Sequence, residues 1–304
     1  MSESTLDLLQ GLLITGTLWA AGVGLGSSVK PGQVLASLRR AGLLGRVTSL
    51  DLVLVPAIMW LSVSLLVSDE DVGTGLLLVA FASAGPLGIK LASRAGGDVA
   101  YAIGLVVMLE LANVVVVPVW AALLGIAASP AVVLDILRTL VLLVLLPIAT
   151  GLAIGSRRPA QSRRWAALLD RISDVGVIAI VALLLARHSS VVGDALGTGA
   201  PVAVLLFVMV ALAAGWMVGG PGRDTRAATS LVTGVRANGA AVAIAASAFA
   251  AEPAVGIGVI IAGLGSVVLP SLLALGLALV TSRPTPWRGR TRPDPWPRSH
   301  DAPG

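Results

Sequence analysis

The chain has 304 residues, of which 56% are hydrophobic and 12% are charged, and its mean hydropathy is +0.94. This excess of apolar residues excludes a soluble domain and predicts a polytopic membrane protein. The net charge of +5 does not indicate nucleic-acid binding, because most arginines lie in short loops between apolar segments. The absence of cysteine and the wide separation of the two histidines argue against a metal site, and no motif calls for a cofactor.

Apolar windows of about 20 residues divide the chain into successive predicted spans. They cover residues 6–27, 44–66, 72–94, 98–127, 130–154, 166–187, 198–219, 226–250 and 254–281. Basic loops alternate with acidic or neutral ones, which places the N-terminus outside and the C-terminus inside. The pattern predicts an all-α fold with nine transmembrane helices. The first window lacks the basic start and cleavage site of a signal peptide, so it should be retained.

The end of the chain differs from the rest. Residues 282–304 are rich in proline and arginine and cannot form a packed core, so they predict a disordered cytoplasmic tail near anionic lipid. Lysine is scarce beside abundant arginine, alanine and glycine, which indicates a bacterial protein of the plasma (inner) membrane.

The third and eighth predicted spans are interrupted in their middle. Residues 84–86 read Ala-Gly-Pro, and proline removes a helix hydrogen bond and clashes with the preceding turn. Residues 234–239 read Gly-Val-Arg-Ala-Asn-Gly, a polar stretch inside an apolar run. Simple kinks are one explanation. However, each break lies in the middle span of a three-span group, and the two groups run in opposite directions. Such paired breaks indicate an inverted repeat with a transporter binding site.

Four ionisable residues lie within apolar spans, namely Asp51, Lys90, Glu110 and Arg236. Ionisable groups are costly in hydrocarbon, so they should face an internal cavity and pair with one another. The four residues provide two acids and two bases for such pairs. The alternative for Lys90 is that its long stem extends to the cytoplasmic end of its span. The alternative for Arg236 and Glu110 is a static buried pair that fixes helix packing.

The interrupted segments resemble those of the bile acid/sodium symporter family. The similarity is clearest in residues 97–100 (GDVA) and 233–239 (TGVRANG), and Pro56 matches a proline of the family's first core helix. The resemblance covers most of residues 6–281. It implies a panel domain and a core domain, with two unwound helices crossing at the site. The panel would hold spans 6–27, 130–154 and 166–187, and the core spans 44–127 and 198–281.

The resemblance also implies alternating-access transport of organic anions such as bile acids and small carboxylates, usually driven by two sodium ions. Positions that supply sodium ligands in the family carry other residues here. The family's second-crossover Glu and Gln fall at Val232 and Arg236, its core-helix Gln at Asp51, and its first-crossover Asn at Ile89 or Lys90. Sodium requires several oxygen ligands and is repelled by a fixed positive charge. We therefore expect arginine and lysine to replace the sodium ions, with Arg236 paired to Asp51 in place of one ion and Lys90 paired to Glu110 in place of the other.

Other residues complete the predicted site. Glu110 and Lys90 are candidate proton carriers, because such side chains can titrate near neutral pH when buried, whereas arginine stays protonated. Half-helix N-termini that face the cavity would favour an anionic group. The candidate substrate-binding residues are Gly85, Asn113, Thr233 and Asn238.

The sequence thus predicts a secondary active transporter of a small organic anion, coupled to protons or working by exchange. One alternative is a sodium symporter that uses backbone carbonyls. Another is a non-transporting membrane receptor or assembly protein on the same scaffold. An enzyme is not expected, because the spans hold no nucleophile–base pair and no metal motif. The expected partners are the anion and membrane lipids, and no oligomeric state follows.

Overall fold

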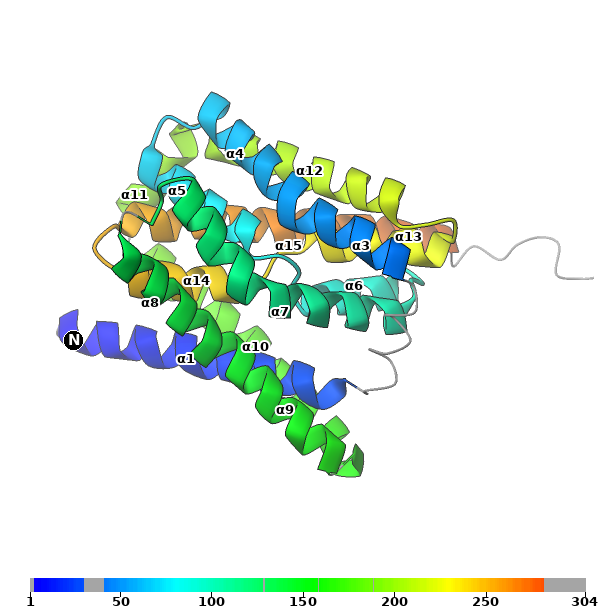
Figure 1. Cartoon of the computed structure of the whole chain (residues 1–304). Coiled ribbons are helices and arrows are strands. Elements are labelled where there is room, and N and C mark those ends of the chain that lie inside the picture. The colour runs from blue at the N-terminus through cyan, green and yellow to red at the C-terminus, as the bar shows by residue number, and fades with distance from the viewer. Residues whose placement is uncertain (1–2, 30–40, 128, 158, 188, 282–304) are drawn as a thin grey trace, which may run out of the picture.

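The computed structural model describes residues 3–29, 41–127, 129–157, 159–187 and 189–281, and the regular elements in these ranges are helices (Figure 1). In chain order they are α1 (Glu3–Ser28), α3 (Ala41–Ser49), α4 (Val55–Leu66), α5 (Glu70–Phe81), α6 (Leu87–Arg94), α7 (Val99–Leu123), α8 (Pro130–Leu140), α9 (Leu146–Arg157), α10 (Pro159–Arg187), α11 (Ser189–Gly197), α12 (Ala200–Val218), α13 (Arg223–Gly234), α14 (Asn238–Ala248) and α15 (Pro253–Thr281). Two π-helical turns, η1 (Leu50–Leu54) and η2 (Val141–Leu145), join α3 to α4 and α8 to α9.

Six helical stretches within the described ranges are long and apolar enough to cross a membrane. They are Leu8–Ser28, Gly42–Leu66, Val99–Leu123, Pro130–Arg157, Ala200–Val218 and Pro253–Val280. The fold is therefore that of an all-helical membrane protein. The remaining predicted spans correspond to α10, a helix of 29 residues, and to the two interrupted segments. The nine-span count and the orientation stay predictions, and the predicted tail lies outside the described residues.

Both interruptions expected from the sequence are present. The third predicted span is divided into α5 and α6, and the eighth into α13 and α14. The two connecting segments meet, because Ser83 and Arg236 form an antiparallel bridge and the Ala237 N–H donates to the Ala82 carbonyl at 2.9 Å. We call this meeting point the crossing.

Residues 84–86 allow the first segment to approach the second so closely. A Cβ atom on Gly85 would lie 2.6 Å from the Arg236 carbonyl oxygen, so only glycine fits there. Ala84 has a φ of 50°, a left-handed conformation that is unfavourable for a residue with a side chain. Pro86 then starts α6 at its N-cap with a φ already suited to a helix. The local sequence therefore both ends one helix and begins the next.

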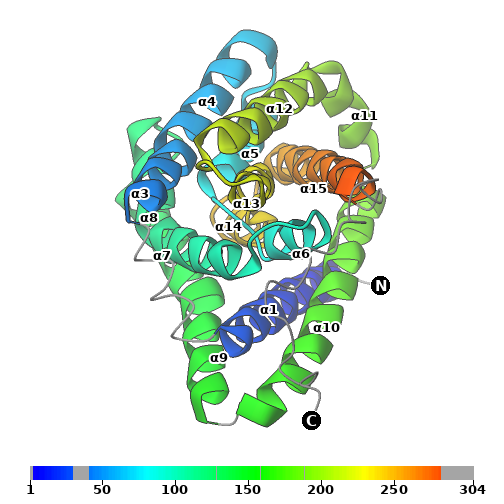
Figure 2. The ribbon, with the colours of Figure 1, turned by 90° about the vertical axis from the view of Figure 1, so that its right-hand side faces the viewer.

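The helices form two groups. Figure 2 shows α1, α9 and α10 together, and α1 packs mainly against α9 and α10. The other helices surround the crossing, where α5 packs against α15, α12 against α13, and α6 against α13. Helix α8 packs against α7 and α14, so the continuous stretch Pro130–Arg157 connects the two groups.

Glycines allow very close helix contacts inside each group. A Cβ atom on Gly258 of α15 would collide with the Val72 carbonyl oxygen of α5, and a Cβ atom on Gly75 of α5 would collide with the Val255 carbonyl oxygen of α15. Gly26 of α1 and Gly151 of α9 make the equivalent contact in the other group. Small residues at such interfaces let backbones meet without side chains between them.

We predict that Gly258→Ala lowers the free energy of unfolding by about 1–3 kcal/mol, because the added methyl group must separate α15 from α5. Gly256→Ala on the same helix is the control. A Cβ atom at Gly256 meets nothing within 4 Å, so this change should be neutral or stabilise by up to about 1 kcal/mol. Thermal unfolding in detergent measures both, and equal midpoints for the two variants would contradict the close contact.

Candidate functional site

A buried ion pair lies at the crossing. Arg236 Nη1 is 2.8 Å from Asp51 Oδ1, and both side chains are fully buried. The hydroxyl of Thr233 donates to the other carboxylate oxygen of Asp51 at 3.1 Å. The pairing of Arg236 with Asp51 expected from the sequence is therefore present.

The remaining donors of the Arg236 guanidinium face the ends of the interrupted helices. Nη2 donates to the Ala80 carbonyl and, at 3.3 Å, to the Ser83 hydroxyl, while Nη1 also donates to the Thr233 carbonyl at 3.4 Å. The last carbonyls of a helix lack partners within the helix and carry partial negative charge. One guanidinium thus satisfies the broken ends of both α5 and α13.

A proline sets the position of Asp51. Asp51 lies in the π-helical turn η1, where the Val55 N–H donates to the Leu50 carbonyl. Pro56 has no N–H, so the Leu52 carbonyl lacks the donor that an α-helix would supply. Trp120 Nε1 provides it instead, at 2.8 Å. The wide turn and the tryptophan together hold this part of the helix so that the Asp51 carboxylate faces Arg236. π-Helical turns are frequent at functional sites.

Asn113 holds the first interrupted segment. Its Nδ2 donates to the Ser83 carbonyl at 2.8 Å, and its Oδ1 accepts from the Ser83 N–H at 2.9 Å. Nδ2 also donates to Glu110 Oε2 at 3.3 Å. This predicted substrate-binding amide therefore contacts the backbone of the crossing, and it positions Glu110, which is only 6% exposed.

The expected pairing of Lys90 with Glu110 is wrong. Lys90 Nζ lies 3.0 Å from Asp170 Oδ2 and 3.1 Å from Asp174 Oδ1, and both aspartates belong to α10. Lys90 is in the first turn of α6, beyond the crossing, and its long stem extends toward the helix group of α1, α9 and α10. Asp170 and Asp174 are not among the site residues predicted from the sequence. Their i,i+4 spacing, which puts both on one helix face, was the available signal.

Most of the predicted site residues line a cavity of about 430 Å³. We call it the crossing cavity. It lies between α1 and α10 on one side and the crossing on the other, and its wall includes the starts of α6 and α14. The predicted site residues that line it are Gly85, Lys90, Glu110, Arg236 and Asn238. Asp51, Asn113 and Thr233 are not among its lining residues and instead support the crossing from behind.

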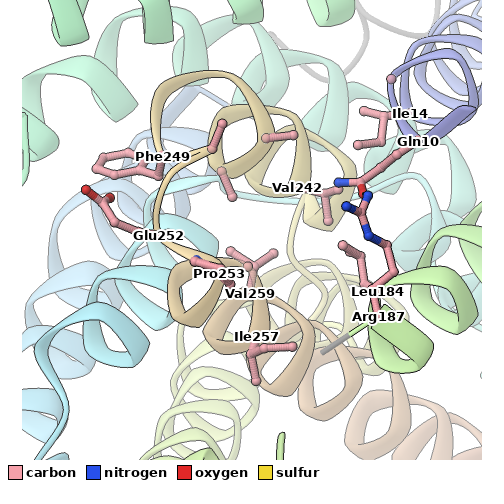
Figure 3. Close-up of a pocket in the computed structure, with 15 residues that line it drawn as sticks. Gln10, Ile14, Leu184, Arg187, Val242, Phe249, Glu252, Pro253, Ile257 and Val259 are labelled. Carbon is pink, nitrogen blue, oxygen red and sulfur yellow. The ribbon is translucent and has the colours of Figure 1, made fainter. Parts of the chain in front are cut away.

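A second cavity of about 520 Å³ lies farther along the same helices (Figure 3). We call it the distal cavity. Gln10 of α1 and Arg187 of α10 face each other in its wall, and Arg187 Nη1 donates to Gln10 Oε1 at 3.0 Å. Leu18 and Gly239 both line the crossing cavity and pack closely, since a Cβ atom on Gly239 would lie 2.5 Å from Leu18 Cδ2. No local sequence feature indicates the distal cavity, because it arises from helix packing.

Comparison with known protein families identifies one family whose members resemble this chain. The profile of the SBF-like CPA transporter family matches residues 20–223. The chain belongs to this family. The resemblance found in the sequence is therefore confirmed, and together with the apolar helices it makes the chain a multi-pass membrane protein of a transporter family. No curated protein matches the chain.

The family match covers only part of the site. It includes Asp51, Lys90 and Glu110 but ends at Arg223, the first residue of α13. The second interrupted segment, with Arg236, lies beyond it. In this member of the SBF-like family the crossing therefore joins matched helices to a segment that the match does not cover.

We predict that Arg236→Gln or Asp51→Asn alone destabilises the protein by about 3–5 kcal/mol, because each leaves one buried charge without its partner. The double variant should lose less than the sum of the two single losses. Unfolding in detergent measures these changes. The exposed pair Asp135–Arg138, with 3.6 Å between its charged atoms, is the control. Asp135→Asn should cost at most about 1 kcal/mol, and an equal cost for Arg236→Gln would contradict a buried pair.

Proposed function

We propose that this member of the SBF-like family is a secondary transporter that moves a small organic anion across the plasma membrane by alternating access, without sodium. The observation that carries the proposal is the buried ion pair of Arg236 and Asp51 at the crossing of two interrupted helices. Interrupted helices that meet at depth in a membrane protein are typical of transporter sites.

The surroundings of the Arg236 guanidinium support the idea that this side chain replaces a bound sodium ion. Arg236 is enclosed by oxygen atoms of a carboxylate, a hydroxyl and backbone carbonyls. These are the ligand types that a hard cation such as sodium prefers. Two positive charges about 4 Å apart repel by about 4 kcal/mol at an effective dielectric constant of 20. A sodium ion therefore has no favourable place beside Arg236.

The crossing cavity favours an anion. The starts of α6 and α14 line it, and helix N-termini carry partial positive charge. Asn238, the first residue of α14, lines the same wall. In this proposal α10 and the two interrupted segments complete nine crossings, with α1, the stretch Pro130–Arg157 and α10 as the panel. The crossing cavity then opens toward the cytoplasmic side and the distal cavity toward the outer side.

Glu110 is the proposed proton carrier. Asp51 is held by Arg236 and Thr233, whereas Glu110 lines the crossing cavity and accepts from Asn113. A carboxyl group that borders the substrate space can exchange a proton as that space changes sides. Lys90, the other predicted carrier, pairs with Asp170 and Asp174 and is not part of this step.

We predict that uptake of labelled small carboxylates or of a labelled bile acid into proteoliposomes follows a proton gradient or an opposing carboxylate gradient and is unchanged by sodium. Sodium and pH gradients are imposed separately. Uptake that requires sodium at constant pH would favour the sodium symporter. Absence of flux for every anion under every gradient would favour a non-transporting receptor. In such a receptor Arg236→Gln would lower the stability of the protein and have no transport to affect.

We further predict that Glu110→Gln removes the proton dependence of uptake while leaving carboxylate exchange intact, because glutamine keeps the hydrogen bond from Asn113 but carries no titratable proton. Initial rates at several pH values measure this. Asp135→Asn, an exposed change on α8, is the control and should keep the pH profile. An unchanged pH profile in Glu110→Gln would exclude Glu110 as the carrier.

A further inference from the structure

Lys90 extends from α6 to two carboxylates on α10 at the edge of the crossing cavity. Its Nζ atom lies within 3.2 Å of both oxygens of Asp174 and 3.0 Å from one oxygen of Asp170. All three residues line the cavity. We propose that Lys90 binds the carboxylate of the transported anion and that Asp170 and Asp174 occupy this position when the anion is absent. This inference rests on the function proposed above.

The position of Lys90 favours an anion more strongly than a lone lysine would. It lies in the first turn of α6, where the helix end is already partly positive, and no acidic residue lies in that turn. The start of α14 lines the same cavity. A lysine at a helix N-terminus is unfavourable unless negative charge is supplied from elsewhere. Here α10 supplies it, and a substrate carboxylate offers the same oxygen atoms.

The lysine contacts are exchangeable, unlike the ion pair at the crossing. The side chains of Lys90, Asp170 and Asp174 are 30%, 44% and 65% exposed. Water screens such pairs, so each contributes little and can be replaced at small cost. The side chains of Arg236 and Asp51 are 0% exposed, and their pair has no such freedom.

Exchange at Lys90 would change how the two helix groups hold together. Helix α6 packs with α7, α13 and α15, whereas α10 packs mainly with α1. The Lys90 pairs therefore bridge the groups across the cavity. An anion that takes Lys90 from the two aspartates releases this bridge, so occupancy of the cavity and relative movement of the groups become linked.

The decisive experiment compares two changes that act in opposite directions. Binding of potassium acetate, potassium succinate and potassium taurocholate to the purified protein is measured by calorimetry. Lys90→Gln should weaken binding at least tenfold. Asp170→Asn combined with Asp174→Asn should strengthen it about threefold or more, because the internal competitor is removed. Lys90→Arg should retain binding, and Arg138→Gln, an exposed arginine of α8, should leave it unchanged.

A purely structural role would move both changes in the same direction. Unchanged or weaker binding in the double aspartate variant, or unchanged binding in Lys90→Gln, overturns the inference. So does the absence of binding in both the wild type and the double variant. If uptake in proteoliposomes survives Lys90→Gln with an unchanged KM, the inference fails while the proposed function stands. Absence of uptake by the wild type defeats the proposed function itself.

The bridge can be tested separately, because the chain has no cysteine. Ala21 of α1 lines the crossing cavity and accepts a single reporter cysteine. In membrane vesicles of both orientations, the reporter should react with an impermeant maleimide at least threefold faster when Lys90→Gln or the double aspartate change is added. Asp135→Asn should not alter the rate. Equal rates in all variants would show that the Lys90 pairs do not hold the groups together.

Discussion

The burial of Arg236 is the constraint on which the crossing depends. An interrupted helix leaves carbonyl groups without partners, and in a membrane interior each such group costs several kcal/mol. Two interrupted helices meet here, and one guanidinium, which has five N–H donors, donates hydrogen bonds to carbonyls at the ends of both. Its own charge would be prohibitive without Asp51 at 2.8 Å. The breaks need the arginine, and the arginine needs the carboxylate.

The position of Asp51 in turn depends on the nearby Pro56 and on Trp120, which is distant in the sequence. Pro56 removes one helix hydrogen bond, η1 widens the turn before it, and Trp120 of α7 satisfies the exposed Leu52 carbonyl. Helix α7 also supplies Asn113, which holds Ser83 of the first break. The same helix therefore fixes the carboxylate side and the backbone side of the crossing. The π-helical turn η2 likewise ends just before Leu146 and Pro147, so a π-helical turn precedes a proline twice in the described residues.

The sequence predicted the parts of the site that the cost of burial dictates. Residues 84–86 and 234–239 cannot continue a helix, and a deeply buried arginine must find an acid, so both breaks and a buried pair for Arg236 follow from the residues. The choice of Asp51 over Glu110 as the acid came from the family resemblance. The partner of Lys90 did not follow. A break shows where a helix stops, not which way its second half runs, and the direction of α6 decides whether Lys90 faces Glu110 or α10. The distal cavity depends on the packing of α1, α10, α14 and α15 and has no local signal.

The two sets of charges differ in the property that an alternating-access mechanism requires of each. A charge that stands in for a coupling ion must stay in place, and the fully buried Arg236 has its donors occupied within one helix group. A charge that senses the substrate must change partners, and Lys90 is 30% exposed and bridges two groups. Tight glycine contacts keep α5 on α15 and α1 on α9, so each group can move as a unit. In the proposed mechanism, the close packing within each group and the exchangeable Lys90 pairs across the cavity allow anion binding to shift one group against the other, while Pro130–Arg157 keeps the two groups connected.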